Sequence, residues 1–292
     1  MVEGVIVKGV GGFYYVKAQE RLYECRARGL FREDNITPLV GDKVLIRINE
    51  EDGTGYIEEI MERKSELIRP PVANVTQAII VMSIKKPDIN FWLLDRFIIL
   101  AEHQNLNIII CLNKVDLTKR EEITSILDIY KNTSYPIVKT STKTGEGIED
   151  LKEYLKDQVT VVAGPSGVGK SSLLNQIKPG LELKTGDVSK KTTRGRHTTR
   201  HVELIDLGSN SYVLDTPGFS SLNLDFIESE EELSRYFNEI DEFATSCKFI
   251  NCLHFKEPGC EVKKQVEKGR ISPVRYENYL KFLEEIKSIR RY

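Results

Sequence analysis

Nine consecutive residues, from Gly164 to Ser172, have the types and spacing needed to bind nucleotide phosphates. They read GPSGVGKSS and fit the pattern G-x-x-x-x-G-K-[ST]. Glycines let the backbone wrap around a phosphate with its N–H groups pointing inward, while Lys170 offers a positive charge to the β- and γ-phosphates. Ser171 offers a hydroxyl ligand to Mg²⁺. The residues predicted to contact the phosphates are Gly164, Pro165, Ser166, Gly167, Val168, Gly169, Lys170, Ser171 and Ser172.

A second motif, NKVD at residues 113–116, indicates which base the nucleotide carries. The carboxylate of Asp116 can accept hydrogen bonds from N1–H and N2–H₂ of guanine, a paired donor edge that adenine lacks. Asn113 and Lys114 would brace this loop and cover the base. A later segment, TSTK at 140–143, offers its backbone to guanine O6, although an ordinary loop leading into a helix would look the same. The residues predicted to bind the base are Asn113, Lys114, Val115, Asp116, Ser141 and Thr142.

A third motif, DTPG at residues 215–218, fits D-x-x-G and completes the set. Asp215 is placed to hold the Mg²⁺ shell, and the N–H of Gly218 is placed to sense the γ-phosphate. The order of the motifs is unusual, because both guanine segments precede the phosphate loop, whereas ordinary small GTPases carry them after D-x-x-G. This order indicates a circularly permuted GTPase domain.

The residue that positions the attacking water is not at its usual place in the sequence. Phe219 follows Gly218, where many GTPases carry a glutamine, and phenylalanine cannot orient water. The imidazole of His197, within GRHTT at 195–199, is the nearest polar candidate. We therefore predict that His197 and Lys170 are the catalytic residues.

The segment from residue 184 to residue 201 is predicted to be the switch region of this GTPase. Six Lys and Arg residues against one Asp give it a net charge of +5. Such a loop is either simply solvated or lies near RNA phosphates. Its threonines, Thr192 and Thr193 included, are candidates for the Mg²⁺ ligand that switch regions supply. The residues predicted to bind magnesium are Ser171, Thr198, Thr199 and Asp215.

Three of the five cysteines cluster with a histidine near the C-terminus, in the pattern C-x₄-C-x-H-x₅-C. Three thiolates and one imidazole make a closed tetrahedral set that is typical of a structural zinc site. The alternative is reduced core cysteines beside a surface histidine. Cys25 and Cys111 fall inside strand patterns and are predicted core residues. The predicted zinc ligands are Cys247, Cys252, His254 and Cys260.

These motifs require a scaffold of alternating strands and helices, and the hydrophobic pattern supplies one. Residues 1–68 contain five short β-branched and aromatic runs, which predict a small barrel of the OB type or an SH3-like barrel. Residues 69–222 predict a parallel α/β sheet with helices on both faces, and residues 223–292 predict a helical zinc-binding domain. The predicted strands of the sheet are 77–83, 107–112, 136–139, 159–163, 202–206 and 212–214, and the predicted helices are 91–103, 121–131, 147–156 and 170–177.

Composition limits the class of protein. The chain has 42 Lys and Arg against 44 Asp and Glu, which excludes a uniformly basic nucleic-acid binder. Apolar runs are far shorter than the roughly 20 residues of a membrane span, and no signal peptide is expected at the N-terminus. With cysteines placed for a metal, these features predict a cytoplasmic protein. The barrel, with 10 basic and 13 acidic residues, is either an RNA-binding domain or a spacer for protein docking.

The order of motifs resembles one family closely. A β-barrel, a permuted GTPase reading NKVD, GPSGVGKSS, GRHTT and DTPG, and the C-x₄-C-x-H-x₅-C cluster are similar to ribosome small subunit-dependent GTPase A, the RsgA/YjeQ family of circularly permuted GTPases. The resemblance covers nearly the whole chain. It implies a monomeric cytoplasmic GTP hydrolase that binds Mg²⁺ with GTP and one structural Zn²⁺. It further implies that the enzyme binds the 30S subunit and 16S rRNA late in small-subunit assembly, and that this particle stimulates its slow hydrolysis.

Two other functions stay open at this point. One is another translation-associated permuted GTPase or a P-loop metabolic enzyme, although a metabolic enzyme would not need NKVD. The other is an RNA-binding scaffold with a weakly active nucleotide site, which the intact Lys170, Ser171 and Asp116 disfavour. The C-terminal 46 residues carry 11 basic and 6 acidic side chains, so the last helix could contact RNA or pack on the GTPase core.

Overall fold

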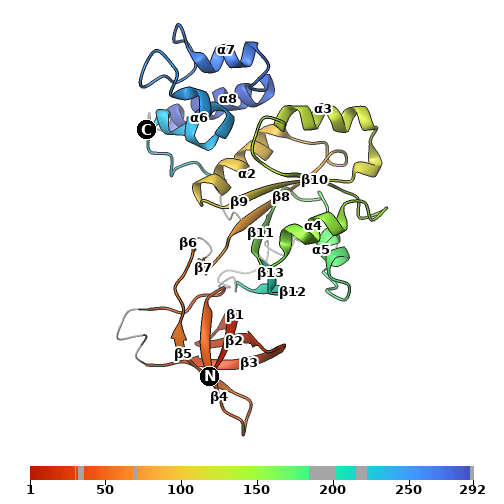
Figure 1. The fold of residues 1–292 in the computed structure, drawn as a ribbon, viewed down its shortest axis with the longest axis vertical. Helices are drawn as coiled ribbons and strands as arrows, with labels where there is room; N and C mark the ends of the chain where they lie inside the picture. Colours follow the sequence, from red (N-terminus) through yellow and green to blue (C-terminus); the bar gives the residue numbers. More distant parts are fainter. Residues whose placement is uncertain (30, 32–35, 69–70, 184–201, 215–221, 290–292) are drawn as a thin grey trace. The chain divides into compact units, whose positions relative to one another are not determined.

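The computed structural model of the chain describes residues 1–29, 31, 36–68, 71–183, 202–214 and 222–289 (Figure 1). The chain packs as two compact units, each built from segments that are distant in sequence. The first unit comprises residues 1–78, 149–163 and 177–220, and the second comprises residues 79–148, 164–176 and 221–292. The three domains expected from sequence, 1–68, 69–222 and 223–292, stay a prediction.

The N-terminal part of the first unit is a closed barrel of five strands in the order β1-β2-β3-β5-β4. The strand β5 pairs with β3 in parallel and with β4 in the antiparallel direction, and β1 closes the barrel on β4. This Greek-key order is that of an OB fold, so the OB expectation is confirmed over the SH3-like alternative. The five strands are β1 (Val2–Val10), β2 (Phe13–Ala18), β3 (Arg21–Ala27), β4 (Lys43–Ile48) and β5 (Gly55–Ile60).

A two-stranded sheet follows the barrel and consists of β6 (Glu66–Ile68) and β7 (Pro71–Ala73). Alternation in the barrel strands sorts the side chains, as their pattern predicts. The side chains of Val16, Cys25 and Ile46 are fully buried inside the barrel.

The central sheet has six strands in the order β10-β9-β8-β11-β13-β12. β10 pairs with β9 in parallel and β11 pairs with β13 in parallel, as expected. The edge strand β12 runs antiparallel to β13, so the sheet is mixed and not parallel throughout. The reason is the two-residue turn at Ser209 and Asn210, both with positive φ, which joins a hairpin and leaves no room for a crossover. The strands are β8 (Gln77–Ser83), β9 (Asn107–Asn113), β10 (Ile137–Thr140), β11 (Val159–Ala163), β12 (Leu204–Gly208) and β13 (Ser211–Leu214).

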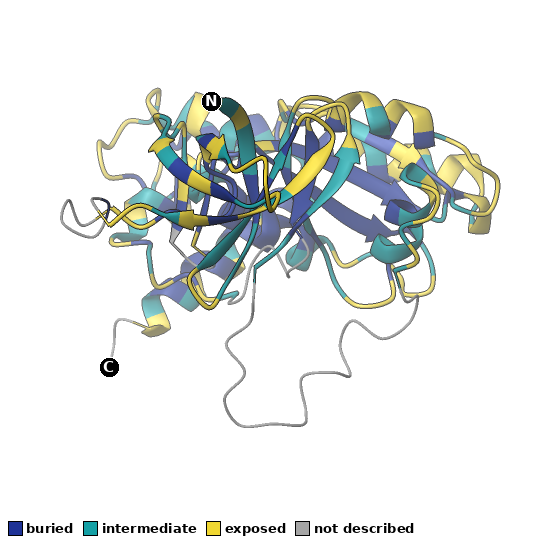
Figure 2. Cartoon of the chain, turned by 90° about the horizontal axis from the view of Figure 1, so that it is seen from below, coloured by how far each residue is buried: buried dark blue, intermediate teal, exposed yellow. Residues whose placement is uncertain are grey.

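Helices alternate with these strands and cover apolar side chains. The side chain of Asn90 caps α2 by accepting a hydrogen bond from the Leu93 N–H, which explains why the helix begins at Phe91. All seven residues of β8 are buried, and the strands of the sheet are mostly dark blue in Figure 2. The helices are α2 (Phe91–His103), η1 (Val115–Leu117), α3 (Arg120–Tyr130), α4 (Ile148–Leu155) and α5 (Lys170–Ile177).

The C-terminal part of the second unit is helical, as expected. Its last helix packs on α2, because Phe282 stacks on Trp92 with ring centroids 5.3 Å apart and Arg275 pairs with Asp95. Packing on the GTPase core is thus the outcome for this helix. Among the described helices none is long and apolar enough to cross a membrane. The elements are η3 (Glu230–Tyr236), α6 (Asn238–Ala244), α7 (Glu261–Glu267) and α8 (Pro273–Ile289).

Candidate nucleotide site and metal centre

The phosphate loop connects β11 to α5 in a conformation that demands glycine. Gly164 has φ +137°, and a Cβ built on it would lie 2.1 Å from the backbone oxygen of Val81. Gly169 has φ +100°, and a Cβ there would lie 2.4 Å from Nδ2 of Asn113. Both positions combine left-handed backbone with close approach, so the glycines of this motif are set by geometry as well as by chemistry.

Lys170, the first residue of α5, keeps its charge at this loop. Its Nζ donates hydrogen bonds to the backbone oxygens of Gly164 at 2.7 Å and of Pro165 at 2.8 Å. Burial lowers the pKa of the Lys170 ammonium. A bound phosphate would offer this partly desolvated cation a stronger acceptor than two neutral carbonyls.

The NKVD loop at the end of β9 lies directly against the phosphate loop. Asn113 donates from Nδ2 to the backbone oxygen of Val168 at 2.8 Å, and its Oδ1 accepts from the hydroxyl of Thr140 at 3.1 Å. The threonine therefore fixes which way the amide points. Lys114, in left-handed conformation with φ 62°, donates from Nζ to the backbone oxygens of Gly167 at 2.6 Å and of Lys86. Two motifs that are 55 residues apart in sequence thus form one wall.

The carboxylate predicted to read guanine is held from one side only. Asp116 is exposed, and its Oδ1 accepts a hydrogen bond of 2.7 Å from the hydroxyl of the fully buried Ser141. The backbone N–H groups of Lys143 and Thr144 donate to the same hydroxyl at 3.3 and 3.2 Å. The second segment predicted to bind the base is therefore hydrogen-bonded to the first.

Two residues of this wall carry no signal in the sequence that would have identified them. Gln176 on α5 donates from Nε2 to the backbone oxygen of Thr142 at 2.9 Å, and so supports the loop at 140–143. Lys86 contributes a backbone oxygen, which no side-chain pattern can announce. The hydroxyl of Thr140 belongs to the quoted TSTK segment, but its contact with Asn113 was not expected.

The structure brings together the predicted base-binding and phosphate-binding residues of the second unit. Other predicted residues lie outside the described part of the chain, so their roles in catalysis and in magnesium binding stay predictions. These are His197, Thr198, Thr199, Asp215 and Gly218, with Thr192, Thr193 and Phe219.

The predicted zinc ligands also come together. The four donor atoms lie within 4.8 Å of one another, with the Sγ atoms of Cys247 and Cys260 3.8 Å apart. Nδ1 of His254 lies 3.6 Å from Sγ of Cys247 and 3.5 Å from Sγ of Cys260. Tetrahedral Zn²⁺, with Zn–S of about 2.3 Å and Zn–N of about 2.0 Å, separates two sulfurs by about 3.8 Å and a sulfur from a nitrogen by about 3.5 Å. The donor set therefore fits one zinc ion.

The surroundings of this cluster suit a closed site. Cys252, His254 and Cys260 are buried, and burial lowers the pKa of the His254 imidazole, which favours the neutral form that binds metal. Burial, together with the neighbouring thiols, raises the pKa of Cys252 to about 12 in the metal-free cluster. From α8 the hydroxyl of Tyr276 donates to the backbone oxygen of His254 at 2.6 Å, which braces the loop.

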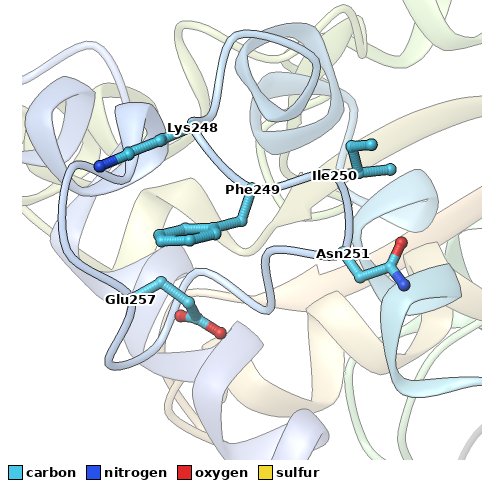
Figure 3. A pocket seen from close by; sticks show the side chains of 5 residues that line it. All are labelled: Lys248, Phe249, Ile250, Asn251 and Glu257. Carbon is cyan, nitrogen blue, oxygen red and sulfur yellow. The ribbon is translucent and has the colours of Figure 1, made fainter.

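An open depression of about 640 Å³ lies beside this cluster (Figure 3). Figure 3 shows Lys248, Phe249, Ile250 and Asn251 on one loop and Glu257 on the following loop. None of the predicted nucleotide-binding residues lines it. Glu257 accepts hydrogen bonds from the backbone N–H groups of Leu253 and Phe255, so its carboxylate supports the metal loop.

Comparison with known proteins gives one consistent result. The chain matches the RsgA GTPase family over residues 60–225 and the RsgA N-terminal domain over residues 3–57. A protein of Alkaliphilus metalliredigens named small ribosomal subunit biogenesis GTPase RsgA is 50% identical over 293 residues, covering 100% of both chains. The protein of the same name from Bacillus cytotoxicus is 52% identical over 291 residues and 98% of both chains.

Two solved structures agree with this in fold. YjeQ from Thermotoga maritima is 41% identical and superposes with a TM-score of 0.82, covering 97% of this chain and 98% of that chain. YloQ, described as a circularly permuted GTPase, is also 41% identical, with a TM-score of 0.81 and coverage of 99% and 96%. The barrel, the permuted motif order and the metal cluster all have their counterpart in this fold. The chain therefore belongs to the RsgA family of circularly permuted GTPases and is a GTP-hydrolysing enzyme.

Proposed function

We propose that this GTPase binds the small (30S) ribosomal subunit and hydrolyses GTP to assist or check its late maturation in the cytoplasm. The nucleotide half of the proposal rests on one observation, the hydrogen bond from Asn113 to Val168 that joins the guanine loop to the phosphate loop. The ribosomal half is supported by the names of relatives that align over the full chain.

In this proposal each loop of the site has a separate task. Asp116 accepts the guanine N1–H and N2–H₂, and the backbone at Ser141 and Thr142 donates to O6. The backbone of Gly164 to Ser172 wraps the phosphates, Lys170 neutralises their charge, and Ser171 completes the Mg²⁺ shell with Asp215 and one switch threonine. Because the loops are already hydrogen-bonded to one another, binding does not have to assemble them, and positioning is the enzyme's main contribution.

The metal centre has a structural task in the same proposal. One Zn²⁺ held by Cys247, Cys252, His254 and Cys260 leaves no open coordination position, so it stabilises the fold and takes no part in hydrolysis. The C-terminal domain then presents a fixed surface to the particle. The barrel contacts 16S rRNA, and the enzyme acts as a monomer.

The deciding experiment measures GTP hydrolysis with and without purified 30S subunits. We expect a slow basal rate and stimulation of about a hundredfold or more by 30S, with 50S subunits as the control particle. Binding of mant-GDP against mant-ADP tests the base preference in the same preparation. Equal rates in the presence and absence of 30S would contradict the ribosomal half, and equal affinity for both nucleotides would contradict the guanine site.

A further inference from the structure

A row of alternating aromatic and arginine side chains crosses four neighbouring strands of the barrel. The strand registers pair Phe13 of β2 with Arg26 of β3, Arg26 with Tyr56 of β5, and Tyr56 with Arg47 of β4. Neighbouring strands lie about 4.8 Å apart, so the four side chains span about 14 Å. We call these four residues the barrel row.

The barrel row faces outward. Side chains alternate between the two faces of a strand, and the adjacent Cys25, Ile46 and Ile57 are fully buried in the barrel core. Tyr56 is 44% exposed, and the Arg47 side chain is 66% exposed. Large aromatic rings and guanidinium planes therefore lie together on a surface that water reaches.

The planar groups of the barrel row are already ordered by one another. The guanidinium carbon of Arg26 lies 4.8 Å from the centroid of the Phe13 ring, and that of Arg47 lies 5.6 Å from the centroid of Tyr56. Glu58 anchors the edge of the row, because it accepts 2.8 Å and 2.6 Å hydrogen bonds from Arg47 and Arg28. Little side-chain entropy remains to be lost when a flat ligand is added.

Charge is distributed unevenly over this barrel. Residues 1–68 carry 10 Lys and Arg against 13 Asp and Glu, a net charge of −3, yet Arg26, Arg28 and Arg47 gather at the barrel row. The acidic side chains nearest to them are Glu58, bound by two of these arginines, and Glu24, which accepts a 3.0 Å hydrogen bond from Tyr15. The row is thus a local cationic and aromatic strip on an otherwise acidic domain.

We infer that the barrel row binds a short single-stranded segment of RNA by stacking bases on its aromatic and guanidinium planes. Single-stranded bases expose their faces and stack on such planes, while the arginines meet the phosphates. A duplex keeps its base faces covered, and a barrel with net charge −3 has no broad basic surface to hold one. The inference deepens the proposed contact with ribosomal RNA and rests on that proposal for the identity of the RNA in the cell.

The test uses the full-length chain without nucleotide or ribosomes. Fluorescence anisotropy measures binding of a fluorescein-labelled ten-nucleotide single-stranded RNA, with the same RNA in a duplex for comparison, over a range of salt concentrations. Tyr56→Leu removes the ring but keeps apolar volume, and Tyr56→Phe keeps the ring. Leu22→Ala is the matched control, because Leu22 is exposed on β3 and pairs with Lys17, away from the barrel row.

We expect Tyr56→Leu to weaken single-strand binding about tenfold, while Tyr56→Phe and Leu22→Ala bind as the wild type does. Arg26→Ala should weaken binding and also reduce the salt slope by about 0.7 if it meets one phosphate. Melting temperatures confirm that each variant is folded.

Three results would overturn the inference: no single-strand binding by the wild type, unchanged binding by Tyr56→Leu, or a duplex bound as tightly as the single strand. A fourth, loss of 30S binding by Tyr56→Leu with unchanged RNA binding, would assign the row to a ribosomal protein instead. These results are separate from the fate of the proposed function, because an enzyme that 30S fails to stimulate could still bind the labelled RNA through this row.

Discussion

The side chain of Asn113 donates a 2.8 Å hydrogen bond to the backbone oxygen of Val168, and so joins the guanine loop to the phosphate loop. In this chain the guanine loop comes first, whereas ordinary small GTPases carry it last. A hydrogen bond depends on where atoms lie and not on chain order, so permutation preserves the contact as long as the sheet closes in the same way. Joined in this way, the two loops are positioned to act together on one nucleotide.

A methyl group at position 169 should break this junction. The Cβ of Gly169→Ala would lie 2.4 Å from Nδ2 of Asn113, at a backbone φ of +100°. We expect mant-GDP affinity to fall at least tenfold. Gly180→Ala is the control, because Gly180 has φ +90° with nothing within 4 Å of its Cβ, so it carries the backbone strain without the clash. Equal affinity of the two variants would show that the Asn113 contact does not matter for binding.

Guanine selection should depend on Asp116. Its exposed carboxylate is held by Ser141, so Asp116→Asn changes the hydrogen-bonding edge with little change in position. The amide offers a donor where guanine also offers one, and it matches the oxygen that xanthine carries instead. We expect the variant to prefer xanthosine to guanosine diphosphate in a competition assay against mant-GDP. Retention of full guanosine preference would remove Asp116 from base recognition.

Zinc should stabilise the C-terminal region and leave the nucleotide site nearly unchanged. We expect one zinc per chain by metal analysis, and loss of that zinc in Cys252→Ser. Because metal binding and folding are coupled, hydrogen exchange should rise mainly after residue 222, while mant-GDP affinity changes less than about threefold. Cys25→Ser, which alters a cysteine of the barrel core, should keep its zinc. Wild-type protein purified without chelator and free of zinc would refute the assignment.

A buried charge network should make stability sensitive to Arg275. This fully buried guanidinium donates to Asp95 on α2 at 2.6 Å and to both carboxylate oxygens of Glu239 on α6 at 2.7 and 2.9 Å. Arg275→Met leaves two buried carboxylates without a counter-charge, which costs about 3–5 kcal/mol of unfolding free energy in denaturant titrations. Adding Asp95→Asn and Glu239→Gln should restore much of this loss. A cost below about 1 kcal/mol would show that the network is unimportant.

The same variant should have a characteristic pH dependence. Burial raises the pKa of the Asp95 carboxyl, and removing Arg275, whose charge lowers that pKa, should raise it further. Between the ordinary value near 4 and the raised value, the folded state then binds more protons than the unfolded state, so stability falls as pH rises through this window. The deficit of Arg275→Met relative to wild type should therefore be smaller at about pH 5.5 than at about pH 7.5. A constant deficit would contradict this account.

Local sequence patterns predicted the parts of the structure whose causes are local. The helix from Phe91 to His103 has the bounds that its apolar period and the Asn90 cap predict. The four metal donors lie within 14 residues, so their spacing was sufficient to predict the cluster. The nucleotide loops could be assigned because one ligand, with a base and phosphates, requires both.

Long-range pairing explains what could not be predicted. Arg275 and Asp95 are 180 residues apart, and each looks like an ordinary surface charge in its own helix pattern. The direction of β12 depends on the turn at Ser209 and Asn210, whereas apolar content only indicates that a strand is present. Gln176 supports the loop at 140–143 from a different element, so no pattern within either segment could indicate that contact.

The last prediction concerns the stimulated rate. Phe219 stands where many GTPases carry a water-orienting side chain, so we expect the free enzyme to be slow. A hundredfold stimulation by 30S requires a barrier lower by only about 2.7 kcal/mol, which one well-placed polar group can supply through positioning. His197→Ala should lose most of the stimulated rate and keep its affinity for mant-GDP and for 30S, whereas His201→Ala, at the end of the same segment, should keep the stimulated rate. If stimulation survives in His197→Ala, the water is positioned by rRNA or by the threonines of that segment, and a scan of Thr192, Thr193, Thr198 and Thr199 to valine distinguishes these two.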